Sequence, residues 1–147
     1  MEAWVSLMAL RRQLGKALDK PENAGHELAK SSDTIAEKAF RLRDFAEHGD
    51  ELALSIFSLQ ANVLGHGLAD LASILDPGLI AIGGGLSETG FREWFIGEVR
   101  KGFAERAMAQ YRISPIPPHE ATTRIEWAVG GDGAAAFGSA RMAMKLV

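Results

Sequence analysis

A short apolar segment that runs directly into three consecutive glycines constrains the fold of this chain more than any other feature. Residues 78–82 are mostly apolar and include two isoleucines, which predicts a buried strand. Gly83, Gly84 and Gly85 follow it, and an amphipathic helix is predicted after them. Because glycine has no Cβ atom, a flat or anionic group can approach the backbone here, near the N–H groups of a helix start. In the alternative interpretation, the glycines only turn the chain, since their spacing does not match the dinucleotide-binding fingerprint.

The same order of elements recurs near the end of the chain. Residues 124–129 predict a second strand, which is followed by Gly130, Gly131 and Gly133 and then by a small-residue helix over residues 134–145. Strand, helix, strand, helix is the pattern of a parallel sheet with crossover connections, so we expect an α/β fold. Ligands of open α/β sheets bind at the carboxyl ends of the strands. Two glycine turns at that edge therefore favour a ligand site over a purely structural role.

The first half of the chain is predicted to be helical. Apolar residues at helical spacing predict a helix over residues 2–19, with Leu7 on its buried face. A second helix begins near Thr34, which has capping-box spacing to a glutamate. The longest helix is predicted from Glu51 to Leu75 and stops before Pro77.

Two glycines, Gly65 and Gly67, lie inside this long helix. Each should destabilise an isolated helix by roughly 0.5–1 kcal/mol, so we expect the close approach of another backbone to offset the loss. Self-association is the expected source of that contact, although packing within one chain would serve equally. His66, between the two glycines, is interpreted as a hydrogen-bonded structural residue rather than a catalytic base.

The length and composition indicate one folded unit and exclude several functions. We expect a single lobe over residues 1–147, with a helical part (1–75) and an α/β part (76–147). The net charge of −3 without a basic block argues against nucleic-acid binding by this chain alone, and the absence of cysteine excludes disulfides and thiolate metal sites. No signal peptide or long uninterrupted apolar run is evident, which predicts a cytoplasmic protein that does not enter a membrane. No arrangement of residues looks catalytic.

Three stretches resemble the C-terminal part of ROK-family proteins, which are bacterial sugar kinases and sugar-responsive repressors. The most specific is Leu68–Ser87, in which a helix ends in aspartate-proline and leads through a strand to the Gly-Gly-Gly turn. Asp132–Gly138 resembles the start of the final glycine- and alanine-rich helix of the family, and Glu2–Ser6 resembles the stretch after its cysteine-rich zinc motif. The resemblance covers nearly the whole chain. It implies the C-terminal lobe of a hexokinase/actin-like (ribonuclease H-like) fold.

The resemblance also implies roles for particular residues. Gly83, Gly84 and Gly85 would lie near the adenosine of ATP, and Glu2 would lie beside the hydroxyl groups of a sugar. It assigns no catalytic residue and no metal ligand to this chain. The general-base aspartate, the phosphate loop and the zinc cysteines belong to the part of the family that would precede Met1. ATP and Mg²⁺ are the expected cofactors of the intact enzyme, and the zinc site of the family is not present in this chain.

The predicted function is that of the C-terminal, nucleotide-side part of an ATP-dependent, glucokinase-like sugar kinase. Its substrate would be a hexose or an amino sugar, and the chain would be inactive without the N-terminal lobe. One alternative is the sugar-sensing lobe of a ROK-type transcriptional repressor, and another is a non-catalytic dimerisation module. A homodimer is expected.

Overall fold

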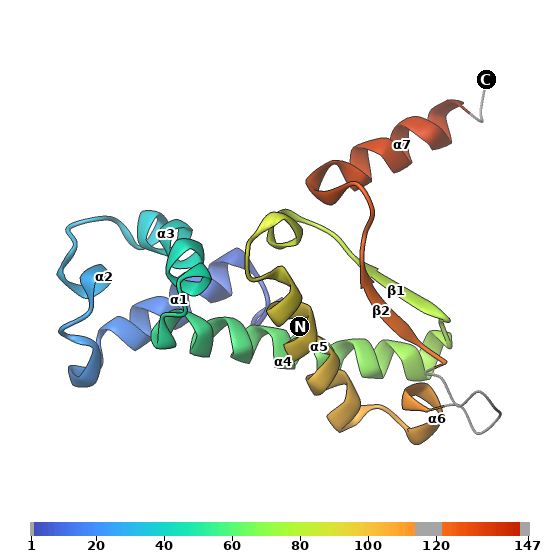
Figure 1. The fold of residues 1–147 in the computed structure, drawn as a ribbon, viewed down its shortest axis with the longest axis horizontal. Coiled ribbons are helices and arrows are strands. Elements are labelled where there is room, and N and C mark those ends of the chain that lie inside the picture. The colour runs from blue at the N-terminus through green and yellow to red at the C-terminus, as the bar shows by residue number, and fades with distance from the viewer. Residues whose placement is uncertain (1, 114–121, 145–147) are drawn as a thin grey trace.

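The first half of the chain is helical, as predicted. The computed structural model describes residues 2–113 and 122–144, and Figure 1 shows the early helices grouped around the amino-terminal half of one long helix. In order, the elements are α1 (Leu7–Leu18), the short 3₁₀ helix η1 (Pro21–Asn23), α2 (Glu27–Lys30), α3 (Ile35–Glu47) and α4 (Glu51–Leu75).

The second half contains two parallel strands, which confirms the predicted α/β class. Its elements are β1 (Leu79–Ile82), η2 (Gly85–Glu88), α5 (Arg92–Arg106), α6 (Ala109–Arg112), β2 (Arg124–Trp127), η3 (Gly131–Gly133) and α7 (Ala134–Met144). In the described part of the chain, β1 and β2 form a two-stranded sheet whose register pairs Leu79 with Arg124 and Ile82 with Trp127. Since the strands run the same way, both carboxyl ends lie at one edge of the sheet.

The long helix α4 begins and ends where the sequence predicted. The Asp50 carboxylate caps it by accepting a hydrogen bond from the Ala53 N–H at 2.8 Å. At the other end Asp76 adopts a left-handed conformation (φ 46°) and the chain turns before Pro77. By length and composition α4 would also suit a membrane span. However, 44% of its most apolar stretch of 18 residues is buried within the fold. It packs against α1, α3 and α5, which is the behaviour of a core helix.

Helices α4 and α5 cross with their backbones almost in contact. A Cβ atom at Gly65 would lie 2.5 Å from the Phe103 nitrogen and closer still to the Val99 carbonyl oxygen. On the facing helix, a Cβ atom at Gly102 would lie 2.5 Å from the Asn62 carbonyl oxygen. The close approach expected at Gly65 is therefore confirmed. The expectation that self-association supplies it is wrong, because α5 of the same chain occupies the site.

A carboxylate between these helices makes stability depend on pH. Glu98 of α5 accepts hydrogen bonds from the Lys101 ammonium and, at 2.9 Å, from the Ser58 hydroxyl of α4. These bonds, that of Lys101 foremost, hold the pKa of Glu98 below its ordinary value of 4.5. A carboxyl group with a lowered pKa stabilises the fold above its unfolded-state pKa. That contribution is lost as the pH falls through the folded-state pKa.

We therefore expect Glu98→Gln to lower the melting temperature at neutral pH and to flatten its decline below pH 4.5. Melting curves between pH 7 and about pH 3 measure this effect. Glu93→Gln is the matched control on α5, because Glu93 is largely exposed and pairs with the adjacent Arg92. Parallel pH profiles for Glu98→Gln and the unchanged chain would contradict the role of Glu98.

The first helix is shorter than predicted. It begins at Leu7, because the Ser6 hydroxyl accepts a hydrogen bond from the Ala9 N–H at 3.1 Å and ends the extended segment before it. Leu7 itself is 54% exposed, so its expected burial is wrong. Leu10 and Leu14 of the same stripe are buried. The periodicity identified the helix, but the extent of the buried face depends on what packs against it.

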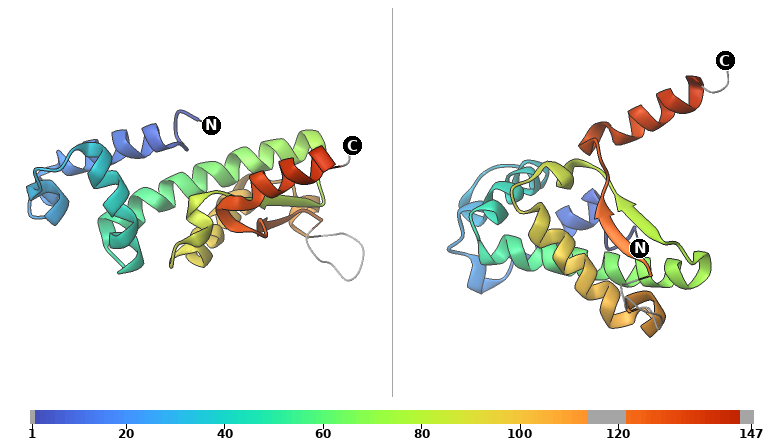
Figure 2. Two further views of the ribbon diagram at one scale, coloured as in Figure 1. Left: turned by 90° about the horizontal axis from the view of Figure 1, so that it is seen from above. Right: turned by 45° about the vertical axis from the view of Figure 1, so that its right-hand side comes forward.

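The last helix projects away from the rest of the molecule. Figures 1 and 2 show α7 extending beyond the sheet, and its main contacts are with η3 at its own start. Phe137, Met142 and Met144 are consequently 68–78% exposed. The sequence predicted the helix but not its exposure.

Candidate functional site

Two glycine turns meet at the carboxyl edge of the sheet. The first, Gly83–Gly85, follows β1, and the second, Gly130–Gly131, follows β2. The short helices that continue from these turns, η2 and η3, contact each other. The parallel register thus brings together two segments that lie more than forty positions apart in the sequence, as the pattern of elements predicted.

Gly84 has a backbone conformation that requires glycine and faces open space. Its φ is 103° and its ψ is 177°, a region that residues with a Cβ atom rarely adopt. A Cβ atom built at Gly84 would meet no other atom within 4 Å. The neighbouring Gly83 is different, because its Cβ would already lie 3.6 Å from the Cβ of Ala128, the residue that follows β2. A flat group thus has room against the backbone at Gly84.

Charged side chains flank the two turns. The Arg43 guanidinium of α3 reaches the first turn, where its Nη1 lies 3.3 Å from the position a Cβ would take at Gly85. The Glu88 carboxylate of η2 lies against Gly131 of the second turn, whose φ is 53°. The edge therefore combines exposed backbone at the glycines with a guanidinium and a carboxylate.

The amino end of α5 is already covered by a carboxylate. Glu47 of α3 accepts a hydrogen bond from the Gly90 N–H at 2.7 Å, immediately before the helix. The sequence predicted that the helix would follow the glycines closely, but η2 intervenes and α5 begins only at Arg92. The Ser87 hydroxyl holds this intervening turn by donating to the Gly84 carbonyl at 2.7 Å. An anionic group is therefore not favoured at the α5 end, because the Glu47 carboxylate already lies there.

Glu2 lies apart from the glycine turns. It is exposed, and Figure 2 shows the first residues on the opposite side of α4 from the two strands. The segment that follows Glu2 is held to α1, where Gln13 donates to the Trp4 carbonyl at 3.2 Å. The described chain thus does not bring Glu2 and the glycine turns together, and the role of Glu2 in sugar binding stays a prediction.

His66 has a structural setting. Its Nε2 lies 3.1 Å from the Glu105 carboxylate, to which the Asn62 side chain also donates at 3.3 Å. These bonds, that of His66 first, lower the pKa of Glu105. His66 therefore ties α4 to α5, in agreement with the structural interpretation. Within residues 2–113 and 122–144, no three histidine or carboxylate side chains gather in a way that could hold a metal ion.

Nothing in the sequence indicated that Arg43 and Glu47 would lie at the site. Both lie on α3, and the Glu47–Gly90 bond joins positions 43 residues apart. Their approach to the first glycine turn depends on how α3 packs beside α4.

The fold places the chain among α/β proteins with parallel strands joined by helical connections. More particularly, the chain belongs to the ROK family, whose sequence model matches residues 1–145. No curated protein matches the chain significantly.

Several solved structures resemble the chain, and two of them are informative here. One is a ROK family glucokinase from Streptomyces griseus, crystallised with glucose and AMPPNP; it is 29% identical, with a TM-score of 0.73 over 96% of this chain. The other is a proposed sugar kinase from Cytophaga hutchinsonii, which is 23% identical with a TM-score of 0.71 over 97% of this chain and supports the fold alone. The chain spans 43% of the length of each solved protein. The fold class predicted from the sequence, one part of a sugar-kinase fold, is thereby confirmed.

Proposed function

We propose that this chain is the C-terminal, nucleotide-side lobe of an ATP-dependent sugar kinase of the glucokinase type. The observation that carries the proposal is the open backbone face at Gly84, where the two glycine turns meet. The similarity to a glucokinase that was crystallised with glucose and an ATP analogue supports both proposed ligands. In the intact enzyme, the γ-phosphoryl group of ATP would pass to a hydroxyl of a hexose or amino sugar.

In this proposal the glycine turn binds the nucleoside part of ATP. The adenosine would lie against the peptide planes of Gly83, Gly84 and Gly85, and the Arg43 guanidinium would border it. A side chain at Gly84 would project into the space that the adenosine needs. ATP supplies the transferable phosphoryl group, and Mg²⁺ balances the charge of its phosphates. No group of three histidine or carboxylate side chains among the described residues could hold a metal ion, so in this proposal other parts of the kinase would hold the Mg²⁺.

The remaining parts of the proposal concern the whole protein. Glu2 would contact the sugar once the rest of the kinase completes the cleft, and the lobe would function in a cytoplasmic homodimer. The zinc site of the family, which uses cysteine ligands, would lie outside this chain, which contains no cysteine.

Adenosine binding tests the proposal. We expect adenosine and ATP to bind the chain with similar, millimolar affinity, because the contact is with the nucleoside. Gly84→Ala should abolish this binding, since its methyl group enters the open face. Isothermal titration calorimetry with adenosine, ATP and inorganic tripolyphosphate measures the three affinities.

A second glycine provides the matched control. Gly49 also has a positive φ (80°) and open space at its Cβ position, but it lies at the α3–α4 junction. Gly49→Ala should cost the fold about 1–2 kcal/mol, as Gly84→Ala does, and should leave adenosine binding unchanged. Undiminished adenosine binding by Gly84→Ala would refute the nucleotide role of the turn. If tripolyphosphate binds and adenosine does not, the chain would contact the phosphates of ATP and not its nucleoside.

A further inference from the structure

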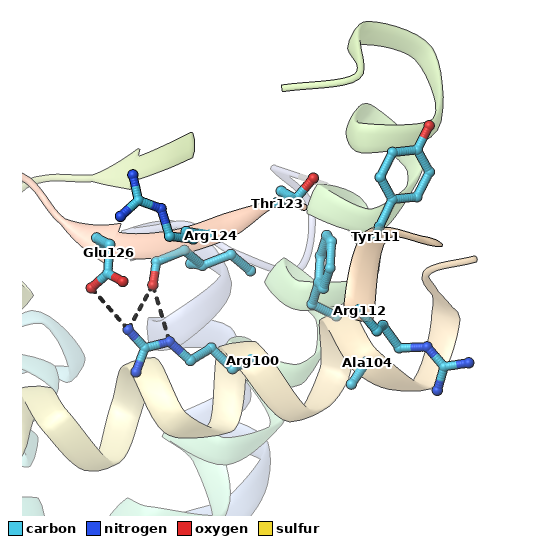
Figure 3. Close-up of a pocket in the computed structure, with 9 residues that line it drawn as sticks. Arg100, Ala104, Tyr111, Arg112, Thr123, Arg124 and Glu126 are labelled. Carbon is cyan, nitrogen blue, oxygen red and sulfur yellow. Dashed lines mark hydrogen bonds and ion pairs between the residues drawn. The ribbon is translucent and has the colours of Figure 1, made fainter. Parts of the chain in front are cut away.

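A pocket opens at the end of the sheet opposite to the glycine turns. It has a volume of about 310 Å³ and lies between α5, α6 and the amino end of β2 (Figure 3). The proposed nucleotide site uses the carboxyl ends of the strands and leaves this pocket without a role. A volume of this size is at the lower end of the range for small-molecule sites.

The inner walls of the pocket are apolar. Phe103 of α5, Tyr111 of α6 and Ile125 of β2 contribute to them, and these side chains are 4–7% exposed. Ala104 of α5 also lines the pocket, and a longer side chain at this position would take up part of its volume. The walls thus suit one aromatic ring or a short branched chain.

Arginines from three elements form the rim. Arg100 is already engaged, because its guanidinium donates to the Ile125 carbonyl at 2.7 and 3.0 Å and pairs with Glu126 at 3.1 Å. That pair neutralises the acidic residue of the lining. Arg112 and Arg124 are exposed at the rim (Figure 3), and neither forms an ion pair with any residue in the described ranges. Beside the apolar slot, the rim therefore carries two guanidinium groups that have no ionic partner among residues 2–113 and 122–144.

We propose that this pocket binds a small organic acid that carries an aromatic or branched apolar group. The apolar group fills the slot, where its transfer from water is favourable. The carboxylate stays at the rim, where a guanidinium matches its geometry with two parallel hydrogen bonds. Because the pocket and the glycine turns lie at opposite ends of β2, the acid and adenosine do not compete.

Phenylacetate and its uncharged analogue phenylacetamide are the probes. The two share shape and apolar area, so a difference in affinity reports the rim arginines. We expect phenylacetate to bind at millimolar concentration and phenylacetamide to bind about tenfold more weakly. Saturation-transfer NMR on the full chain gives both affinities, and an excess of adenosine should displace neither probe.

Three variants assign the binding to this pocket. Ala104→Leu should abolish the binding of phenylacetate by filling the slot, and Arg124→Gln should reduce it about tenfold. Arg141→Gln removes an exposed arginine from α7 and should have no effect. Melting curves establish that each variant is folded. Failure of phenylacetate to bind, equal affinity of the amide, displacement by adenosine, or unchanged binding by folded Ala104→Leu would each overturn the proposal.

Discussion

Replacing Gly65 with leucine is expected to lower the melting temperature of the chain by roughly 10 °C, which corresponds to a loss of about 3 kcal/mol in the free energy of unfolding. The reason is the crossing of α4 and α5, where a Cβ atom at Gly65 already overlaps the backbone of Val99 and Phe103. Backbone atoms cannot rotate away as a flexible side chain does, so the helices must separate. Thermal unfolding followed by circular dichroism measures the shift.

The same helix pair supplies matched controls. Gly102→Ala should also destabilise the chain, because its Cβ would meet the backbone of Asn62. Gly97 lies on α5 too, but a Cβ there would have nothing within 4 Å. Gly97→Ala should therefore stabilise the chain by up to about 1 kcal/mol through its better helix propensity. A neutral Gly65→Leu variant would show that the close crossing does not exist in solution.

The purified 147-residue chain is expected to release no ADP above background with any hexose or amino sugar. Phosphoryl transfer requires tightly bound phosphates, a correctly positioned metal ion and a general base beside the acceptor hydroxyl. The described residues hold no cluster suited to a metal ion, and Glu47 covers the amino end of α5. A missing general base alone costs about 10²–10⁴-fold in rate, and the loss of the phosphate clamp as well should leave activity near background.

A coupled assay of ADP release, with an intact ROK glucokinase as the positive control, measures this activity. Adding the N-terminal lobe of a ROK kinase as a separate chain should restore part of the turnover, because the two lobes share one cleft. The added lobe alone is the control for that experiment. Robust sugar-dependent turnover by the 147 residues alone would show that the catalytic groups lie within this chain.

The elements that the sequence predicted best are those whose ends depend on neighbouring residues. The Thr34–Glu37 capping box forms as expected, Asp50 caps α4, and Pro77 follows its last turn. Each of these capping and terminating interactions involves residues only a few positions apart, so it can be recognised from one sequence. The exposed Leu7 shows the limit, since only the packing of other elements determines whether a helical face is buried.

The candidate site was predictable to a similar degree. Parallel strands ending in glycine had to meet at one edge, and the structure brings Gly83–Gly85 and Gly130–Gly131 together there. The flanking Arg43 and the carboxylate of Glu47 were not predictable, because both come from a helix far away in the sequence. The conformation of Gly84 could not be predicted either. A sequence of three adjacent glycines does not indicate which of them adopts a positive φ.

The bond between Arg100 and the Ile125 carbonyl also affects how the sheet can grow. In the parallel ladder, Arg124 and Ala128 donate their N–H groups to β1, so Ile125 between them directs its carbonyl to the outer side of β2. A strand of another molecule would need that carbonyl to pair with β2, and the Arg100 guanidinium already occupies it. The molecule thereby discourages edge-to-edge aggregation on the β2 side. The other edge of β1 pairs with no strand among the described residues, so extension of the sheet is directed there.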